Sequence, residues 1–100
     1  MSLYTMNNED FVFSVCLKLT KIENSSYELY NIIRDACDNK DQAERFIKII
    51  HENIAKIHDL KVLAKCRLLK DTLLYKSIED LEQRILHLED QCHSIKVRLE

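Results

Sequence analysis

The chain has 100 residues, of which 46% are hydrophobic and 32% are charged, and its formal net charge is −2. This composition is too apolar for a disordered tail, and the small net charge provides no strong field to attract nucleic acid or a membrane surface. The length suffices for one small domain, in which oligomerisation is a natural source of further stability.

The chain contains neither glycine nor proline, the residues that most often end helices or form tight turns. An all-α fold is therefore predicted. The longest apolar runs are far shorter than the roughly 20 residues needed to cross a bilayer, so no membrane association is expected. Glu9 and Asp10 precede the apolar residues 11–17, where a signal peptide would carry positive charge. With four scattered cysteines and no CxxC pair, these features predict an intracellular protein, cytoplasmic or nuclear, with free thiols.

The first helix is predicted to begin at Asn7 or Asn8, whose side chains can accept hydrogen bonds from free backbone amides. Apolar residues then occur on nearly all sides of this helix, so it needs cover from more than one direction. These residues form a candidate partner surface: Phe11, Val12, Phe13, Val15 and Leu19. Cover by the rest of the chain in a three-helix bundle is an equal alternative, and an intermolecular strand is a lesser one.

A second helix is predicted to begin at Ser26, because Ser25 and Glu28 have the spacing of a capping box. It is expected to end in the polar run at residues 38–41, where Asn39 can adopt the left-handed conformation in the absence of glycine. This run is the predicted boundary between N-terminal helices over residues 1–40, which form the head, and a long helix over residues 41–100.

Nothing interrupts the helical pattern from residue 42 onward, and an unbroken helix to the end would approach about 90 Å. The first half of this helix is therefore expected to fold against the N-terminal helices. The result is a helical hairpin or small bundle, from which residues 74–100 project. A bend at residues 70–77 is the main alternative, since Ser77 followed by Asp80 can start a separate helix.

Apolar residues recur at alternating steps of four and three over residues 74–99, the heptad pattern of a coiled coil. This seam consists of Leu74, Ile78, Leu81, Ile85, Leu88, Cys92, Ile95 and Leu99. Isoleucine at the first core position with leucine at the second favours a parallel dimer, in which Arg84 would pair with Glu89 of the other copy. Cys92 would then face its counterpart and form an interchain disulfide on oxidation. The alternative is an amphipathic helix in an ordinary three- or four-helix core.

Residue types that bind metals or catalyse reactions are present without the required arrangement. His87, Cys92 and His93 come nearest to a zinc site, but their spacing spreads them around a helix. His51 and His58, seven residues apart, share one face and are interpreted as flanking positions of a helical interface. A chain without glycine also has few loops for a shaped pocket. We therefore expect no enzymatic activity, no metal, no cofactor and no small-molecule substrate.

A run of cations without an intervening acid is the strongest local charge feature: Lys61, Lys65, Arg67 and Lys70. It could contact phosphate groups, so a helical nucleic-acid-binding protein is one alternative function. Against it, Arg67 lies well around the helix from Lys61 and Lys65, and the aromatic residues typical of single-strand binding are absent. A solvated helical face is the favoured interpretation.

The patterns together predict a non-enzymatic oligomerisation or scaffold module that acts through helix–helix contacts, with itself or another helical protein as partner. Because the seam is still in phase at Leu99, the chain is expected to be a fragment of a longer coiled-coil protein. A subunit of a hetero-oligomeric helical complex, of the cytoskeletal, kinetochore, tethering or viral assembly type, is the alternative.

Overall fold

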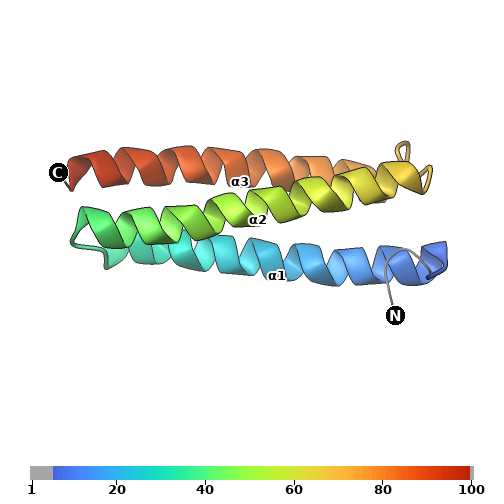
Figure 1. Cartoon of the computed structure of the whole chain (residues 1–100), viewed down its shortest axis with the longest axis horizontal. Coiled ribbons are helices and arrows are strands. Elements are labelled where there is room, and N and C mark those ends of the chain that lie inside the picture. The colour runs from blue at the N-terminus through green and yellow to red at the C-terminus, as the bar shows by residue number, and fades with distance from the viewer. Residues whose placement is uncertain (1–5, 100) are drawn as a thin grey trace.

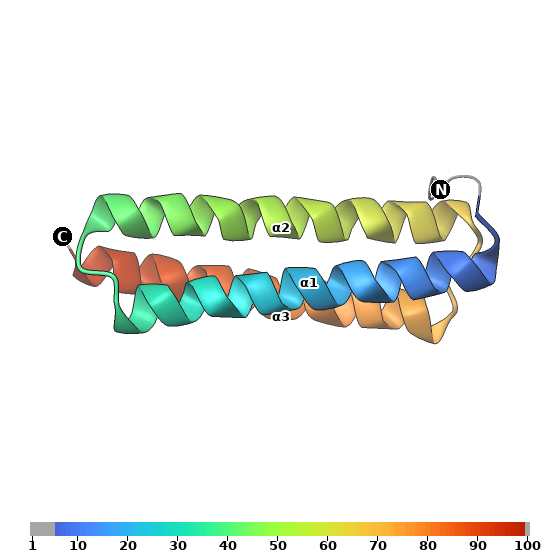
Figure 2. The same ribbon diagram turned by 90° about the horizontal axis from the view of Figure 1, so that it is seen from below.

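A computed structural model describes residues 6–99, which form three helices: α1 (Asn8–Asp35), α2 (Lys40–Cys66) and α3 (Leu73–Arg98). They lie side by side, with α2 antiparallel to both α1 and α3, and each helix packs against the other two (Figures 1 and 2). The longest dimension is 48 Å, so each helix runs nearly the full length of the molecule. The predicted all-α fold is confirmed for these residues.

A polar side chain caps the start of each helix. Asn7 Oδ1 accepts a hydrogen bond from the Asp10 amide at 2.8 Å, and Asn39 Oδ1 accepts one from the Gln42 amide at 2.8 Å. Thr72 Oγ1 has the same role at α3. The predicted start at Asn7 is thus confirmed. Asn39 is extended, with φ −140°, and begins α2, so its predicted left-handed role at the end of the preceding helix is wrong.

The helix α1 continues through Ser25 and Ser26, so the predicted helix start at Ser26 is wrong. Ser26 is buried, and its hydroxyl accepts a hydrogen bond from Asn53 Nδ2 of α2 at 3.0 Å. Its side chain therefore serves a contact between helices and does not cap a backbone amide. A buried polar pair is satisfied only when both residues align, so this bond favours one register of α1 against α2.

The predicted unbroken helix over residues 41–100 is wrong, because the chain turns back at residues 67–72. Leu68 adopts the left-handed conformation, with φ 61°. Its amide donates to the Lys65 carbonyl at 2.9 Å, and the Leu69 amide donates to the Ala64 carbonyl at 3.0 Å. These two bonds form a Schellman motif, in which the left-handed position is usually glycine. The following helix begins at Leu73 and not at the alternative start, Ser77.

Replacing Leu68 with glycine is expected to raise the free energy of unfolding by about 1 kcal/mol, because the left-handed conformation disfavours any side chain with a Cβ atom. Leu68 is 91% exposed, so its substitution removes little packing. Urea denaturation of the monomer measures the change. A loss of stability in the glycine variant would contradict this account of the turn.

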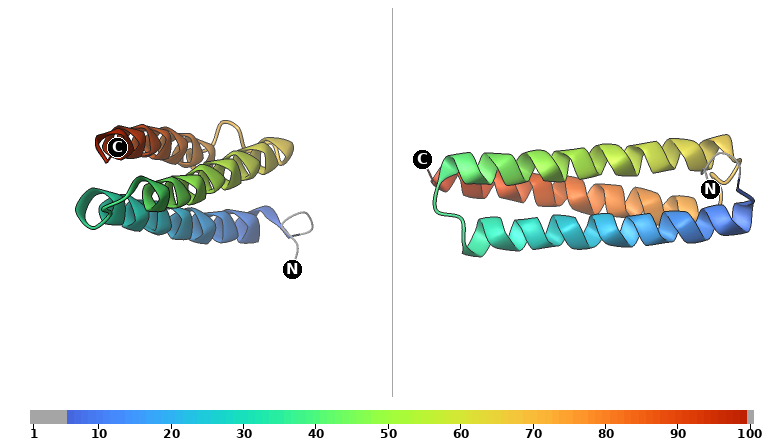
Figure 3. Two further views of the ribbon diagram at one scale, coloured as in Figure 1. Left: turned by 60° about the vertical axis from the view of Figure 1, so that its left-hand side comes forward. Right: turned by 60° about the horizontal axis from the view of Figure 1, so that its bottom comes forward.

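One hydrophobic core draws on all three helices. Its fully buried large apolar side chains are Phe11, Val15 and Ile33 of α1, Ile50 and Ile57 of α2, and Ile78 and Ile85 of α3. Figure 3 shows α3 (orange to red) running alongside the other two helices to its C-terminal end. Residues 74–98 therefore pack in the bundle. The sequence pattern had instead predicted that this segment projects from a head.

Candidate functional site

The heptad seam packs against helices of its own chain. Its residues Leu74, Ile78, Leu81, Ile85, Leu88 and Cys92 are buried in the shared core, where Ile95 also packs. Leu99 is half-buried. The seam thus has its expected apolar contacts, and the helices that supply them are α1 and α2. Pairing of the seam with another chain stays a prediction.

The two charged residues predicted to link seam helices also make contacts within the chain. Arg84 Nη1 donates to Glu23 Oε2 of α1, and this hydrogen bond raises the pKa of Arg84 despite partial burial. Glu89 Oε2 lies 3.0 Å from His51 Nδ1 of α2. Arg84 and Glu89 therefore orient α3 against both neighbouring helices.

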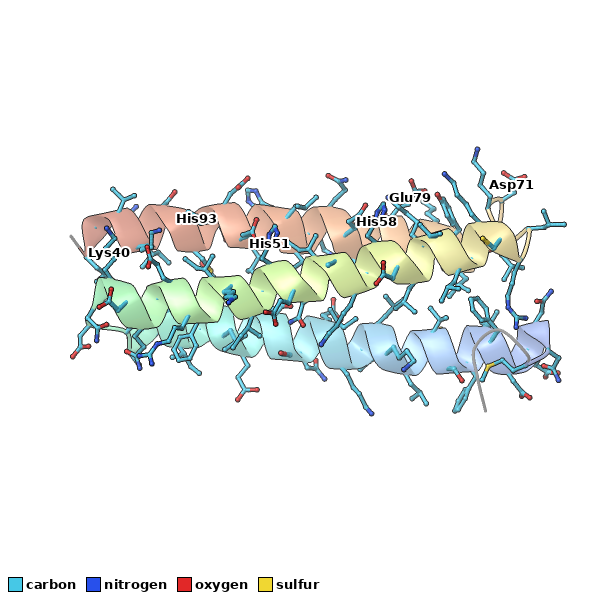
Figure 4. All side chains as sticks on the ribbon, viewed as in Figure 1. Lys40, His51, His58, Asp71, Glu79 and His93 are labelled. Atoms are coloured by element: carbon cyan, nitrogen blue, oxygen red, sulfur yellow. The ribbon has the colours of Figure 1, made fainter. Side chains whose placement is uncertain are left out.

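Polar side-chain pairs between α2 and α3 follow a heptad repeat. The pairs are seven residues apart on each helix and step in opposite directions: Glu44–Lys96, His51–Glu89 and His58–Glu82. His51 and His58 occur on the same helix along this interface (Figure 4). This spacing is that of flanking positions in an antiparallel helix pair, and the interpretation of both histidines as flanking residues is confirmed.

Glu82 is the one acidic residue buried among those described, at 8% exposure. Lys61 Nζ lies 2.7 Å from Glu82 Oε1, and His58 Nδ1 lies 3.7 Å from Glu82 Oε2. The hydrogen bond from Lys61 compensates the buried carboxylate, and it raises the pKa of Lys61 against the opposing effect of burial. Charge in this part of the bundle is therefore paired between helices.

The predicted N-terminal partner surface divides into buried and exposed residues. Phe11, Val15 and Leu19 lie in the core, and Val12 is half-buried against it. Phe13, by contrast, is 66% exposed. Leu17, one turn further along α1, is also exposed, at 50%. We call Phe13 and Leu17 the outer row of α1.

The predicted cationic run is partly used inside the fold. Besides Lys61, which pairs with Glu82, Arg67 is engaged: its guanidinium lies 4.4 Å from the centroid of the Phe11 ring. Arg67 also donates to Asn8 Oδ1 at 2.9 Å and to the Met6 carbonyl. These contacts fasten the start of α1 to the end of α2. Lys65 and Lys70 remain exposed.

The cysteines and the residues nearest to a zinc site in the sequence do not form a cluster in the described part of the chain. Within residues 6–99, no group of three or more His, Cys, Asp and Glu side chains could hold a metal ion. Cys92 is buried in the core, and burial raises its pKa to about 11. Cys16 and Cys66 are exposed. In the same part of the chain, no helix combines the length and apolar character needed to cross a membrane.

No family model, curated protein or solved structure matches this chain. What it binds is therefore inferred from its own surfaces. Two surfaces of the described residues are candidates for binding: the exposed apolar outer row of α1, and a groove between α1 and α2 that has both apolar and charged residues.

The groove encloses about 420 Å³, and its walls carry more positive than negative charge. Ile22, Leu60 and Leu63 form its apolar part. Its charged residues are Lys18 and Lys21 from α1, and Lys56 and Asp59 from α2. We call it the lysine groove. Sequence analysis missed it, because Lys56 joins the other lysines only once the register of α1 against α2 is fixed.

Proposed function

We propose that this chain is a non-enzymatic oligomerisation or scaffold module that acts through helix–helix contacts between proteins. The outer row of α1 supports the proposal most directly. Phe13 and Leu17 are one turn apart, and both point away from the core that buries Phe11 and Val15. A helix with apolar residues on two sides can pack in two directions. Because Phe13 and Leu17 are neighbours on one helix, they form a continuous exposed apolar patch, and such patches often mark sites of protein–protein contact.

The first partner we propose is a second copy of the chain. A parallel, in-register coiled-coil dimer through the seam is one form of this proposal. That form requires α3 to leave α1 and α2, because Ile78, Ile85 and Cys92 are fully buried there. A dimer through the outer row requires no such rearrangement. As predicted from the sequence, we propose that the chain acts inside the cell, in the cytoplasm or the nucleus.

Replacing both Phe13 and Leu17 with serine is expected to weaken self-association about tenfold or more, because interface anchors contribute more than 1 kcal/mol each. Stability of the monomer should change little, since both side chains are largely exposed. Light scattering and sedimentation equilibrium over a range of concentrations measure the association. Val62→Ser on α2, another exposed apolar residue at 44%, is the matched control. A wild-type chain that stays monomeric throughout would refute self-association.

A second candidate function is that of a subunit in a hetero-oligomeric helical complex. The lysine groove favours it, because Lys18, Lys21 and Lys56 outnumber the single acid Asp59 beside an apolar floor. An amphipathic helix with acidic flanks is complementary to such a groove in both charge and shape. Its apolar face would contact Leu63 while its carboxylates meet the lysines, forming a four-helix bundle.

Three synthetic helical peptides test this groove, identical except for flanks of glutamate, glutamine or lysine. Fluorescence anisotropy should detect binding of the glutamate peptide and weaker binding of the others. The double variant Lys21→Glu, Lys56→Glu is expected to lower that affinity about tenfold or more. Lys70→Glu, in the connection before α3, is the matched control and should leave affinity unchanged. Equal binding of the lysine peptide, or no loss in the double variant, would exclude an acidic partner here.

A further inference from the structure

The connection between α2 and α3 is held in a conformation that its sequence disfavours. Leu68 has φ 61°, in the region that favours glycine, and its side chain is 91% exposed, so packing does not compensate the conformation. Residues 67–72 include no glycine and no proline. Their sequence is compatible with a helix that continues from α2 into α3.

Two sets of bonds hold the turn closed. The Schellman motif satisfies the last carbonyls of α2 through the Leu68 and Leu69 amides. At the other side, Thr72 Oγ1 accepts from the Tyr75 amide at 3.3 Å and donates to the Leu69 carbonyl at 2.6 Å. A continuous helix would replace these bonds with ordinary backbone hydrogen bonds and would return Leu68 to the right-handed conformation. The closed and open hinges therefore differ little in hydrogen bonding.

From this hinge we propose a domain-swapped dimer, in which residues 67–72 straighten and α3 packs on α1 and α2 of a second copy. This inference rests on the proposed self-association and gives it a route other than the outer row of α1. Phe13 and Leu17 stay as exposed in the swapped dimer as in the monomer, so the variant that replaces both with serine should leave the swapped dimer intact. In each copy α2 and α3 become one helix over residues 40–98, about 90 Å long. The two long helices run antiparallel, because α3 is antiparallel to α2 in the bundle (Figure 1).

The contacts that α3 makes in the monomer specify its place in the swapped dimer. Ile78 and Ile85 enter the same core, and Arg84 meets Glu23 of the other copy. The antiparallel polar pairs, such as His51–Glu89, re-form between chains. Because these contacts are conserved on exchange, the equilibrium depends on the hinge and on the entropy of association.

Two substitutions of Leu68 distinguish exchange through the hinge from dimerisation through the exposed leucine side chain. Leu68→Gly removes the penalty of the closed turn, which we take as about fivefold per hinge. Each dimer releases two hinges, so the dimer dissociation constant should rise about 25-fold. Leu68→Ala removes the same exposed leucine but keeps a Cβ atom, and it should change the constant only a few-fold. Sedimentation equilibrium after refolding at high concentration measures both. Equal weakening by the two variants would overturn the hinge mechanism.

Crosslinking between two differently substituted chains identifies the exchange itself. One chain carries His51→Cys and the other Glu89→Cys, with the native cysteines replaced by serine or, at Cys92, by alanine. After joint refolding, a short bismaleimide should join the two different chains, because only a swapped dimer brings these positions together between chains. Either substituted chain refolded alone is the control and should give no such product.

The outcomes separate this inference from the proposed function. A dimer without the crosslink between the two substituted chains overturns the exchange and leaves self-association standing. In the unsubstituted chain, a dimer linked through Cys92 under mild oxidation indicates the parallel seam and likewise overturns the exchange. A chain that remains monomeric after concentrated refolding overturns both.

Discussion

Replacing Ile85 with alanine is expected to lower the free energy of unfolding by about 2–5 kcal/mol, the range for large-to-small changes in a packed core. Ile85 is fully buried, with 0% exposure, among side chains of all three helices. Because the helices that cover it belong to the same chain, the loss should not depend on protein concentration. Urea denaturation of monomeric protein at two concentrations measures both properties.

The neighbouring Leu86→Ala is the matched control for this experiment. It removes a comparable apolar group from a side chain that is 36% exposed, so a loss of no more than about 1 kcal/mol is expected. If the Ile85 variant lost stability only at low concentration, the seam would be covered by another chain. Equal losses in the two variants would contradict the burial of Ile85 in this core.

The thiol of Cys92 is expected to react with iodoacetamide at least about 100-fold more slowly than that of Cys16 at pH 8. Burial, with a smaller effect of Glu89, raises the pKa of Cys92 from 9.0 to about 11. That shift alone lowers the thiolate fraction about 100-fold, and steric protection slows the reaction further. Isotope-coded alkylation followed by mass spectrometry of the peptides measures each rate.

Cys66 is the internal control, because it is exposed in the same molecule and should react like Cys16. In denaturant, all the cysteines should react at similar rates. Fast labelling of Cys92 in the native chain would contradict its burial.

The same shift predicts how stability depends on pH. The folded state holds the Cys92 proton to higher pH than the unfolded state, where the pKa is near 9.0. The contribution of this group is therefore fully present below about pH 9 and is lost as pH rises toward about 11. Comparison of wild type with Cys92→Ala between pH 8 and 11 measures it. A wild-type stability that rises relative to the variant over this interval would contradict the sign.

The sequence was sufficient to identify the apolar seam but not the helices that cover it. The alternating spacing of Ile78, Leu81 and Ile85 specifies a helix buried along one stripe. That pattern is the same whether the covering helix follows in the same chain or belongs to another. Whether α3 folds back onto its own chain depends on the turn at Leu68, which adopts the left-handed conformation. Glycine usually marks such a turn in a sequence, so a leucine at this position does not predict it.

Local signals also competed with contacts between helices. Ser25 and Glu28 have capping-box spacing, yet the Ser25 hydroxyl accepts a hydrogen bond at 3.4 Å from Asn53, 28 residues further along the chain. Asn7 caps α1 as predicted, and its side chain bonds to the amide of Asp10 in the same helical turn. The lysine groove and the outer row could be located only after the three helices were assembled, since exposure of Phe13 and proximity of Lys21 to Lys56 are properties of the packing.

The parallel orientation of α1 and α3 makes the two ends of the bundle electrically unequal. Peptide dipoles of antiparallel helices cancel in pairs, and the described bundle has one helix more in one direction than in the other. The end where α1 and α3 begin retains partial positive charge, near the acids Glu9 and Asp10, and the opposite end retains partial negative charge, near Arg98. These side chains oppose the uncancelled helix dipole at both tips, so they stabilise the helix ends and weaken the field along the bundle axis.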